Sequence, residues 1–367
     1  MTYLANRVKV STATTGTGPI TVGAAEPGFQ TLASAGVPTG ATVSYLLEDG
    51  LAAELGSGVY DSSAGTVTRN FIWSTTGARL NLSGNAKWLL SLLASDVVSL
   101  DKQPFTANGL WQKRRYAKNV YLVGIGGGAG GGGGRTGAAG TARSGGGGGS
   151  GAGWSDRLID ASLLGDTEPV FIGAGGAGGI SRTTDTTSGA PGASGGNTTF
   201  GSIFVAGGGL AAGFATTSNL NSVSGGTGSV IGGSSGGTSV TANGGTPPPP
   251  LGIAPGGGGG GGSISTGNVA LNAGLGGSNG SGSPLFNAAR GGPGEAGADG
   301  MNMSVGDTEG GSGGGGGGAG LTGPAGAGGA GGFPGGGGGG GGAAQNGFPS
   351  GAGGAGASGY LIAFTTG

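Results

Sequence analysis

The residues whose types and spacing come closest to a known chemistry lie in the run VYLVGIGGGAGGGGGR, at Val120–Arg135. Within it, Gly124 to Ala129 fits the G-x-G-x-x-A fingerprint of a dinucleotide-binding turn. That fingerprint requires a helix directly after the glycines and an acidic residue about 20 positions further on. Here more glycine follows, which disfavours a helix by about 1 kcal/mol per residue, and the next acidic residue, Asp156, is too distant. The match is a product of abundant glycine, and no cofactor is expected.

Other catalytic chemistries lack their residues. The chain has no cysteine and no histidine, which excludes thiolate and imidazole catalysis and the usual zinc sites. Hydrolysis of glycosidic bonds needs paired carboxylates, and no such pattern is found. Glu295, Asp299, Asp307 and Glu309 lie in one glycine-rich stretch, but without the spacing of an EF-hand. The sequence therefore predicts no enzyme, no catalytic residue and no metal site.

Charge and hydropathy exclude further classes. The formal net charge of the 367 residues is −1, so no basic excess is available to neutralise phosphates and no nucleic-acid partner is expected. The first residues lack the apolar core of a signal peptide. No run approaches the roughly 18 apolar residues of a membrane helix. We expect the protein to be made in a cytoplasm. If it leaves the cell, it does so by a route other than a cleaved signal peptide.

Glycine divides the chain in two. Only 13 of the 105 glycines precede Lys118. We predict an N-terminal antiparallel β domain at 1–100, a junction at 101–118 and a glycine-rich domain at 119–367. Strand-like stretches begin at Ala41, Ala52 and Thr66, with hairpin spacing, whereas 86–98 fits either a strand or a short helix.

Aromatic residues of the first domain are expected in its core, the usual location of such side chains. They are Tyr45, Phe71, Trp73 and Trp88. A ligand-binding aromatic patch is the alternative.

The junction carries the dense basic cluster of the chain, formed by Lys113, Arg114, Arg115 and Lys118. One interpretation is a solvated face that keeps a connector soluble. The other is a docking contact with an acidic partner surface or an anionic glycan.

Four apolar islands interrupt the glycine-rich domain, at 119–126, 154–179, 197–209 and 358–367. Each has strand composition, and we expect the first and last to pair in one sheet of a small β-sandwich. From Gly311 to Gly341 every third residue is glycine, which is typical of three-residue helices like polyproline II. The glycine runs are therefore predicted to be polyglycine-II-like helices or, alternatively, mobile loops; the whole chain is all-β.

The order of these islands resembles the glycine-rich domain of bacteriophage tail-fibre and adhesin proteins. The stretches that carry the resemblance are, in order, FTANGLWQKRRYAKNVYLVGIGGGAGGGGG, EPVFIGAGGAGG, GGNTTFGSIFVAGGG and the terminal GGAGASGYLIAFTTG. Phe105, Gly109 and Trp111 occupy the positions of that family's aromatic opening. The proline that usually follows the tryptophan is absent. The N-terminal MTYLANRVKVSTATTGTG is similar to the leading module of phage tail proteins.

The resemblance implies that variable loops between glycine segments contact the host. The matching stretches are 180–194, 214–225, 241–255 and 283–310, which combine aromatic anchors with adaptable polar residues. The candidate receptor-binding residues are Phe214, Asn219, Asn221, Phe286, Asn287 and Arg290. The alternative is that these stretches are only turns at the ends of a bundle.

The predicted function is that of a phage virion structural protein, a tail fibre or tail-tip adhesin that acts as a receptor-binding protein in host attachment. Residues 1–100 would serve virion attachment. The expected partners are other virion proteins and a bacterial surface glycan or outer-membrane protein, in a homo-oligomer for which the family favours a trimer. Alternatives are a head fibre or decoration protein, and a bacterial glycine-rich surface or matrix protein.

Overall fold

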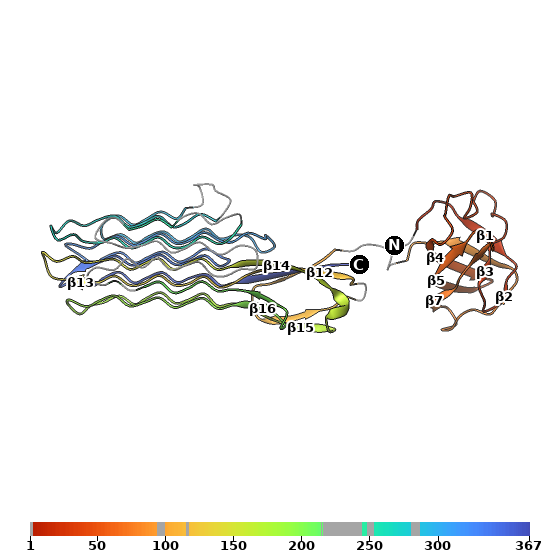
Figure 1. Ribbon diagram of the computed structural model, residues 1–367, viewed down its shortest axis with the longest axis horizontal. Coiled ribbons are helices and arrows are strands. Elements are labelled where there is room, and N and C mark those ends of the chain that lie inside the picture. The colour runs from red at the N-terminus through yellow and green to blue at the C-terminus, as the bar shows by residue number, and fades with distance from the viewer. Residues whose placement is uncertain are drawn as a thin grey trace. The chain divides into compact units, whose positions relative to one another are not determined.

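The computed structural model describes residues 3–93, 100–114, 117–213, 215, 244–247, 253–279 and 287–367. The chain forms two compact units, Met1–Leu100 (unit 1) and Asp101–Thr366 (unit 2) (Figure 1). Both are built from strands and extended segments, and the described residues contain one short 3-10 helix. The predicted junction is not a separate connector, because its strands pair within the sheets of unit 2.

Unit 1 is an antiparallel β structure. Its main sheet has the strand order β1-β9-β4-β5-β6-β3, with β7 also paired to β5, and β2 pairs with β8. The strands are β1 (Lys9–Thr12), β2 (Thr15–Gly16), β3 (Ile20–Thr21), β4 (Thr42–Asp49), β5 (Ala52–Asp61), β6 (Thr66–Val67), β7 (Asn70–Ser74), β8 (Leu82–Ser83) and β9 (Ala86–Leu90). The stretch that fitted either a strand or a helix thus begins as a strand, and 94–99 lie outside the described residues.

Side chains from one face of this sheet form the core of unit 1. Trp88 and Tyr45 are fully buried there, as predicted, and their ring centroids lie 6.0 Å apart. The prediction for Trp73 is wrong, because 52% of its surface is exposed. Trp73 pairs with Leu55, next to a register shift between Leu55 and Gly56. The irregular pairing leaves the indole on the outer face of the sheet.

Unit 2 contains two four-stranded sheets, ordered β10-β19-β12-β14 and β11-β15-β16-β17, and a parallel pair, β13 with β18. The elements are β10 (Asp101–Phe105), β11 (Gly109–Gln112), β12 (Asn119–Ile125), β13 (Thr136–Gly137), β14 (Trp154–Asp160), the 3-10 helix η2 (Ala161–Leu163), β15 (Thr167–Phe171), β16 (Thr198–Phe200), β17 (Phe204–Ala206), β18 (Ala344–Gln345) and β19 (Tyr360–Thr366). The predicted pairing of the first and last islands is confirmed, since β12 and β19 are antiparallel neighbours from Asn119 to Ile125.

One buried cluster unites the two sheets. Trp111 of β11 is fully buried and meets Phe200 of β16 edge-on, with ring centroids 5.5 Å apart. Leu122 of β12 and Leu361 of β19 contribute from the other sheet. A Cβ on Gly124 would run into the ring of Phe204, so glycine is required there for the sheets to approach.

Backbone hydrogen bonds recur every third residue in the glycine segment Gly126–Arg135, which follows β12. The N–H groups of Gly126 and every third residue after it donate to carbonyls of 144–153. The set that begins at Gly127 donates to carbonyls of 190–196, and the set that begins at Gly128 donates to carbonyls of 351–357. The carbonyls of the same segment accept from 176–179, 209–212 and 338–344. The first three neighbours run antiparallel to it and the last three parallel. This central segment is therefore surrounded by six others.

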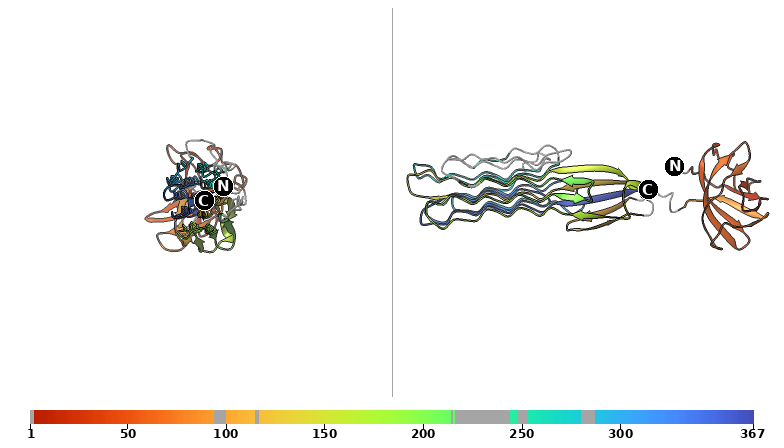
Figure 2. Two further views of the ribbon diagram at one scale, coloured as in Figure 1. Left: turned by 90° about the vertical axis from the view of Figure 1, so that its left-hand side faces the viewer. Right: turned by 60° about the horizontal axis from the view of Figure 1, so that its bottom comes forward.

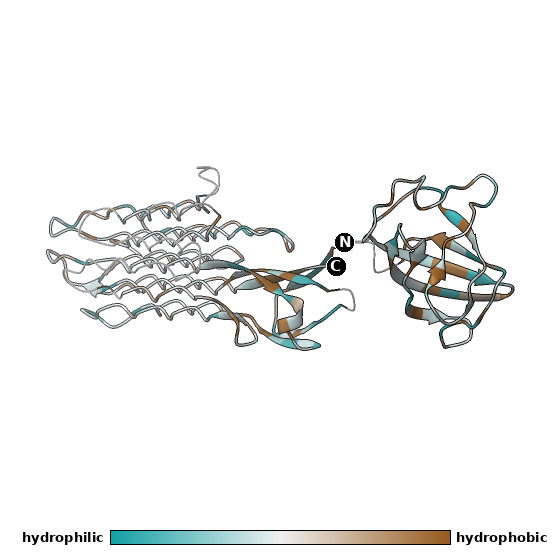
Figure 3. Ribbon diagram, turned by 45° about the vertical axis from the view of Figure 1, so that its right-hand side comes forward, coloured by the Kyte–Doolittle hydropathy of each residue, from teal (hydrophilic) through white to brown (hydrophobic). Residues whose placement is uncertain are grey.

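The glycine segments leave the sheets, turn and come back, and they lie side by side along unit 2 (Figure 2). The turns away from the sheets include the residues around β13 and β18 (Figure 1). Hydrophobic residues concentrate in the strands, while the long segments are nearly neutral in hydropathy (Figure 3). The sheets thus anchor one end of an array whose interior is backbone.

The lack of a side chain explains why the central segment is glycine. A Cβ on Gly127, Gly131 or Gly134 would overlap the carbonyl oxygen of a neighbouring segment. None of the glycines from Gly126 to Gly134 has φ in the left-handed region. Close approach of backbones, rather than conformational freedom, makes glycine necessary there.

Interior and surface segments differ in composition. All residues of 126–134 are buried. In 173–180, by contrast, burial follows a period of three: the buried positions are Gly173, Gly176 and Gly179, and the exposed ones are Ala174, Ala177 and Ile180. A run of glycine interrupted only by the small Ala129 therefore occupies the interior here, whereas a Gly-Ala-Gly repeat marks a segment with one solvent face.

Candidate functional site

Side chains reappear where the glycine segments turn at the end of unit 2 opposite its own sheets. We refer to 138–143, 181–188, 264–270 and 345–350 as the distal loops. Arg143 and Ile264 pair as an isolated bridge, and β13 pairs with β18. These pairings hold turns that are far apart in sequence next to one another.

Side-chain hydrogen bonds tie the loops 181–188 and 345–350 together. The N–H groups of Arg182 and Thr186 donate to Ser350 Oγ and Asn346 Oδ1, at 2.8 and 2.9 Å. The Gly347 N–H donates to Asp185 Oδ1 at 2.7 Å. The loops are thus fixed to each other rather than independently solvated.

Arg143 fixes the second pair of loops. Its side chain is fully buried, and its Nη2 donates to Asn268 Oδ1 at 2.7 Å. The same amide oxygen accepts from the Gly140 N–H at 2.9 Å. Thr136 Oγ1 extends the connections by donating to Thr184 O at 2.7 Å. Together these contacts link all four distal loops into one surface.

Several hydroxyl groups are exposed on this surface, together with the apolar side chain of Val269. Thr141, Thr183, Thr184 and Thr266 are exposed, as is Asp185. Neutral hydroxyls donate and accept hydrogen bonds, and their loops are already ordered, which lowers the entropy cost of binding. The surface is suited to a polar ligand.

Most of the sequence-predicted receptor residues fall outside the described residues, namely Phe214, Asn219, Asn221 and Phe286. Asn287 is half-buried and Arg290 is exposed. Both lie on a segment whose flanking residues Ala288 and Gly291 bond to neighbouring segments. The range 283–310 is therefore not one loop, because its described part forms two such segments joined by a turn around Gly294. Asn287 and Arg290 are not part of the four distal loops, but the turn around Gly294 reaches the same end of unit 2, because the Gly294 N–H donates to Ala319 O and Gly320 bridges to Ala344 of β18.

The basic cluster is partly engaged within unit 2. Lys113 Nζ donates to Leu164 O at 3.1 Å. Arg114 forms an ion pair with Asp101 at 2.8 Å, and this contact holds the pKa of the Asp101 carboxyl below its usual value. Lys118 is exposed, and Arg115 lies outside the described residues. The docking interpretation stays a prediction that rests mainly on Lys118.

Three acidic residues of 295–309 accept backbone hydrogen bonds, two of them within local turns and one from a neighbouring segment. Glu295 Oε2 accepts from the Gly292 N–H, Asp299 Oδ1 from the Ala330 N–H and Asp307 Oδ2 from the Ser304 N–H. Within the described ranges, no group of three potential ligand residues is placed to hold a metal ion.

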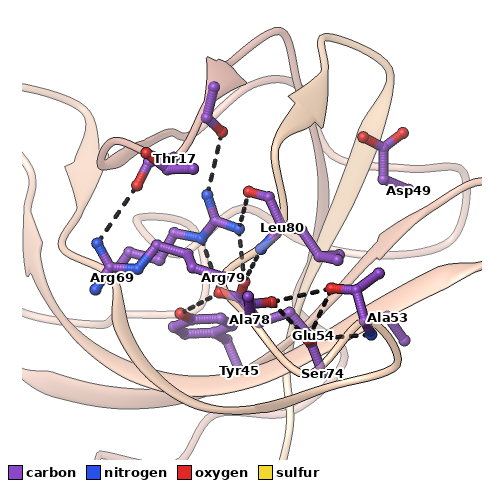
Figure 4. Close-up of polar contacts among 12 residues, drawn as sticks. Thr17, Tyr45, Asp49, Ala53, Glu54, Arg69, Ser74, Ala78, Arg79 and Leu80 are labelled. Atoms are coloured by element: carbon purple, nitrogen blue, oxygen red, sulfur yellow. Dashed lines mark hydrogen bonds and ion pairs between the residues drawn. The ribbon is translucent and has the colours of Figure 1, made fainter.

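The strongest cluster of ionisable groups lies inside unit 1 (Figure 4). Glu54 accepts from Arg69 Nε and Nη2 at 2.7 and 2.6 Å, from the Leu80 N–H at 2.7 Å and from Tyr45 Oη at 3.0 Å. Glu54 and Arg69 are almost completely buried. Because both charged side chains are enclosed and paired, this network has the character of a structural core element.

The pKa values of this network reflect burial and pairing. Burial alone would raise the pKa of the Glu54 carboxyl, but hydrogen bonds from Arg69, Leu80 and Tyr45 outweigh it and lower that pKa. Burial and the adjacent Glu54 carboxylate raise the pKa of Tyr45. Glu54 is therefore ionised and Tyr45 is protonated at neutral pH.

Comparison of the chain with protein-family models and with curated protein sequences finds no match. No helix in the described parts of the chain has the length and apolar character needed to cross a membrane.

Sequence reasoning missed three of the four distal loops. A signal for them is present, because RTGAAGTARS, SISTGNVALN and AQNGFPS interrupt glycine runs of similar length. Evenly spaced interruptions of this kind indicate the turns of a segmented array. Which turns meet at one end depends on the direction of each segment, and glycine runs do not encode that direction locally.

Proposed function

We propose that the chain is a phage virion structural protein, a tail fibre or tail-tip adhesin, whose distal loops bind the bacterial surface during host attachment. The observation that carries this proposal is the linking of four sequence-distant loops into one polar surface by the contacts of Arg143, Thr136, Asp185 and Asn346. A preordered surface on a stiff support is what a receptor-binding element needs. Unit 1 would attach the chain to other virion proteins, with a homotrimer as the favoured assembly.

The glycine segments are proposed to be polyglycine-II-like helices that extend from a β-sandwich made of the two four-stranded sheets of unit 2. The three-residue period of the hydrogen bonds supports this geometry. In glycine, the direction in which a Cβ would lie is a Cα–H bond. That bond points at a neighbouring carbonyl oxygen at Gly127, Gly131 and Gly134, an arrangement that adds weak hydrogen bonds between helices.

Two measurements test the function. Antibodies against the chain should label virions in negative-stain images, and purified full-length chain should compete with virions for adsorption to their host. A bulky Thr183→Trp substitution should abolish the competition, since Thr183 is exposed on a distal loop. Leu163→Trp is the matched control, because Leu163 is 78% exposed on η2, at the sheets. Equal competition by both variants, or unlabelled virions, would contradict the proposal.

A further inference from the structure

Two guanidinium groups meet at one serine of a distal loop. Arg135 Nη1 donates to Ser188 Oγ at 3.2 Å, and Arg182 Nε donates to Ser188 O at 3.0 Å. Both arginine side chains are partly exposed. Arg135 ends the central glycine segment and Arg182 begins the loop 181–188, so separate parts of the chain bring the two charges together.

The partners of these arginines are neutral. None of the ion pairs among the described residues includes Arg135, Arg143 or Arg182. The buried Nε of Arg135 and Nη1 of Arg143 have no hydrogen-bond partner in the described structure. Elsewhere the chain does pair its arginines, as Arg69 does with Glu54 and Arg114 with Asp101. The distal loops therefore hold positive charge that the protein leaves uncompensated.

The nearby carboxylate offsets only part of this charge. Asp185 belongs to the same loop, but its Oδ1 accepts from the Gly347 N–H at 2.7 Å and forms no described ion pair with Arg135 or Arg182. Arg143 adds a third positive charge behind the surface, since the Arg135 N–H donates to the carbonyl of Ser144, the residue next to Arg143. An arriving anion would meet an attractive field.

We propose that Arg135 and Arg182 form a binding site for an oxyanion, a phosphate or a carboxylate, carried by a bacterial surface polymer. Guanidinium groups present planar sets of donors that match both anions. The exposed hydroxyls of Thr183 and Thr184 lie in the same loop and are available to the uncharged part of the polymer. The polymer as the carrier rests on the proposed function; the affinity for the anion does not.

The test measures binding of the purified full-length chain to three immobilised polymers: polyphosphate, polygalacturonate and uncharged dextran. We expect binding to at least one anionic polymer and none to dextran, and the preferred polymer identifies the anion. Arg135→Gln and Arg182→Gln should each weaken that binding about tenfold, the effect of losing one charge-assisted hydrogen bond. Arg157→Gln is the matched control and should change it less than twofold, because Arg157 is exposed on β14, at the sheets.

Asp185→Asn supplies an independent variant that removes the nearby negative charge and should strengthen binding. It also keeps the test decisive if an arginine variant fails to fold. The proposal is overturned if neither anionic polymer binds more than dextran does, or if Asp185→Asn and the folded variants of Arg135 and Arg182 all bind like Arg157→Gln.

Cell adsorption separates this site from the proposed function. If wild-type chain and folded Arg182→Gln adsorb equally to host cells and to polymers, the anion site is wrong and the function stands. If the arginines control polymer binding but wild-type chain does not adsorb to host cells, the anion site stands and the function is wrong.

Discussion

The buried interior of unit 1 is filled by large side chains such as Trp88, Tyr45 and Leu47, whereas the buried segment 126–134 of unit 2 contains no side chain larger than that of Ala129. Unit 1 gains stability from apolar burial and from one enclosed ion pair. The central glycine segment of unit 2 instead forms a packed interior with its backbone, which is hydrogen-bonded to six neighbouring segments. The difference teaches that a close-packed interior does not require a hydrophobic core of side chains.

The largest effect is expected from Gly131→Val in the central segment. The new side chain would overlap the Gly339 carbonyl, so the neighbouring backbone must move. We expect unit 2 to lose at least about 3 kcal/mol of unfolding free energy, the upper end of overpacking costs. Denaturant unfolding of the full chain measures this.

Gly323→Val is the matched control. No atom lies within 4 Å of a Cβ at that position, and a change within about 0.5 kcal/mol is expected. Equal tolerance of both substitutions would mean that the segments are not packed against each other.

In unit 1, side-chain volume should matter instead. Trp88→Ala should cost about 3–5 kcal/mol of unfolding free energy, as is usual for a fully buried aromatic residue. Trp73→Ala, at a half-exposed position, should cost less than about 1 kcal/mol. If the two substitutions cost the same in thermal unfolding, the assignment of Trp73 to the outer face is wrong.

Glu54→Gln tests the enclosed ion pair. The uncompensated Arg69 should cost about 3 kcal/mol. Because the folded-state pKa of Glu54 is lowered, its contribution is complete above the ordinary carboxyl pKa and is lost as pH falls through the lowered value. Unit 1 of the wild type should therefore lose stability on acidification more steeply than Glu54→Gln does. Parallel pH profiles would show that Glu54 is not preferentially stabilised in its ionised form.

The smallest effect belongs to the surface pair of Lys87 and Glu26, at 2.9 Å. Lys87 is about half exposed, so Glu26→Gln should change the unfolding free energy less than any substitution above apart from the Gly323→Val control. A larger change in thermal unfolding would show that charge, as well as burial, organises unit 1.

Local sequence was enough to predict β4 and β5 of unit 1 and the pairing of β12 with β19, because these apolar stretches are bounded by turn residues. It failed at Trp73, where a register shift decides which face the indole takes. The candidate site was harder. The predicted residues Asn287 and Arg290 lie on a hydrogen-bonded segment, and the distal loops were recognisable only once the direction of each glycine segment was known.

The composition of a glycine run indicates whether its segment is buried. An uninterrupted run such as 130–134 is buried on every side, while the alanines at Ala174 and Ala177 mark a solvent face. A three-residue spacing of alanine among glycines therefore predicts a surface segment. The partner of each segment is not encoded in this way, since one glycine N–H is chemically the same as the next.

The central claim is that the segment Gly126–Arg135 is held by backbone hydrogen bonds to its six neighbours. Amide hydrogen exchange of the full chain, resolved for Gly130, Gly131 and Gly132, tests it most directly. These N–H groups donate to Ala193, Gly354 and Gly147 at 2.8–2.9 Å, and their protection should match that of Leu122 in β12. Exchange at the rate of an unfolded chain, with Leu122 still protected, would contradict the account.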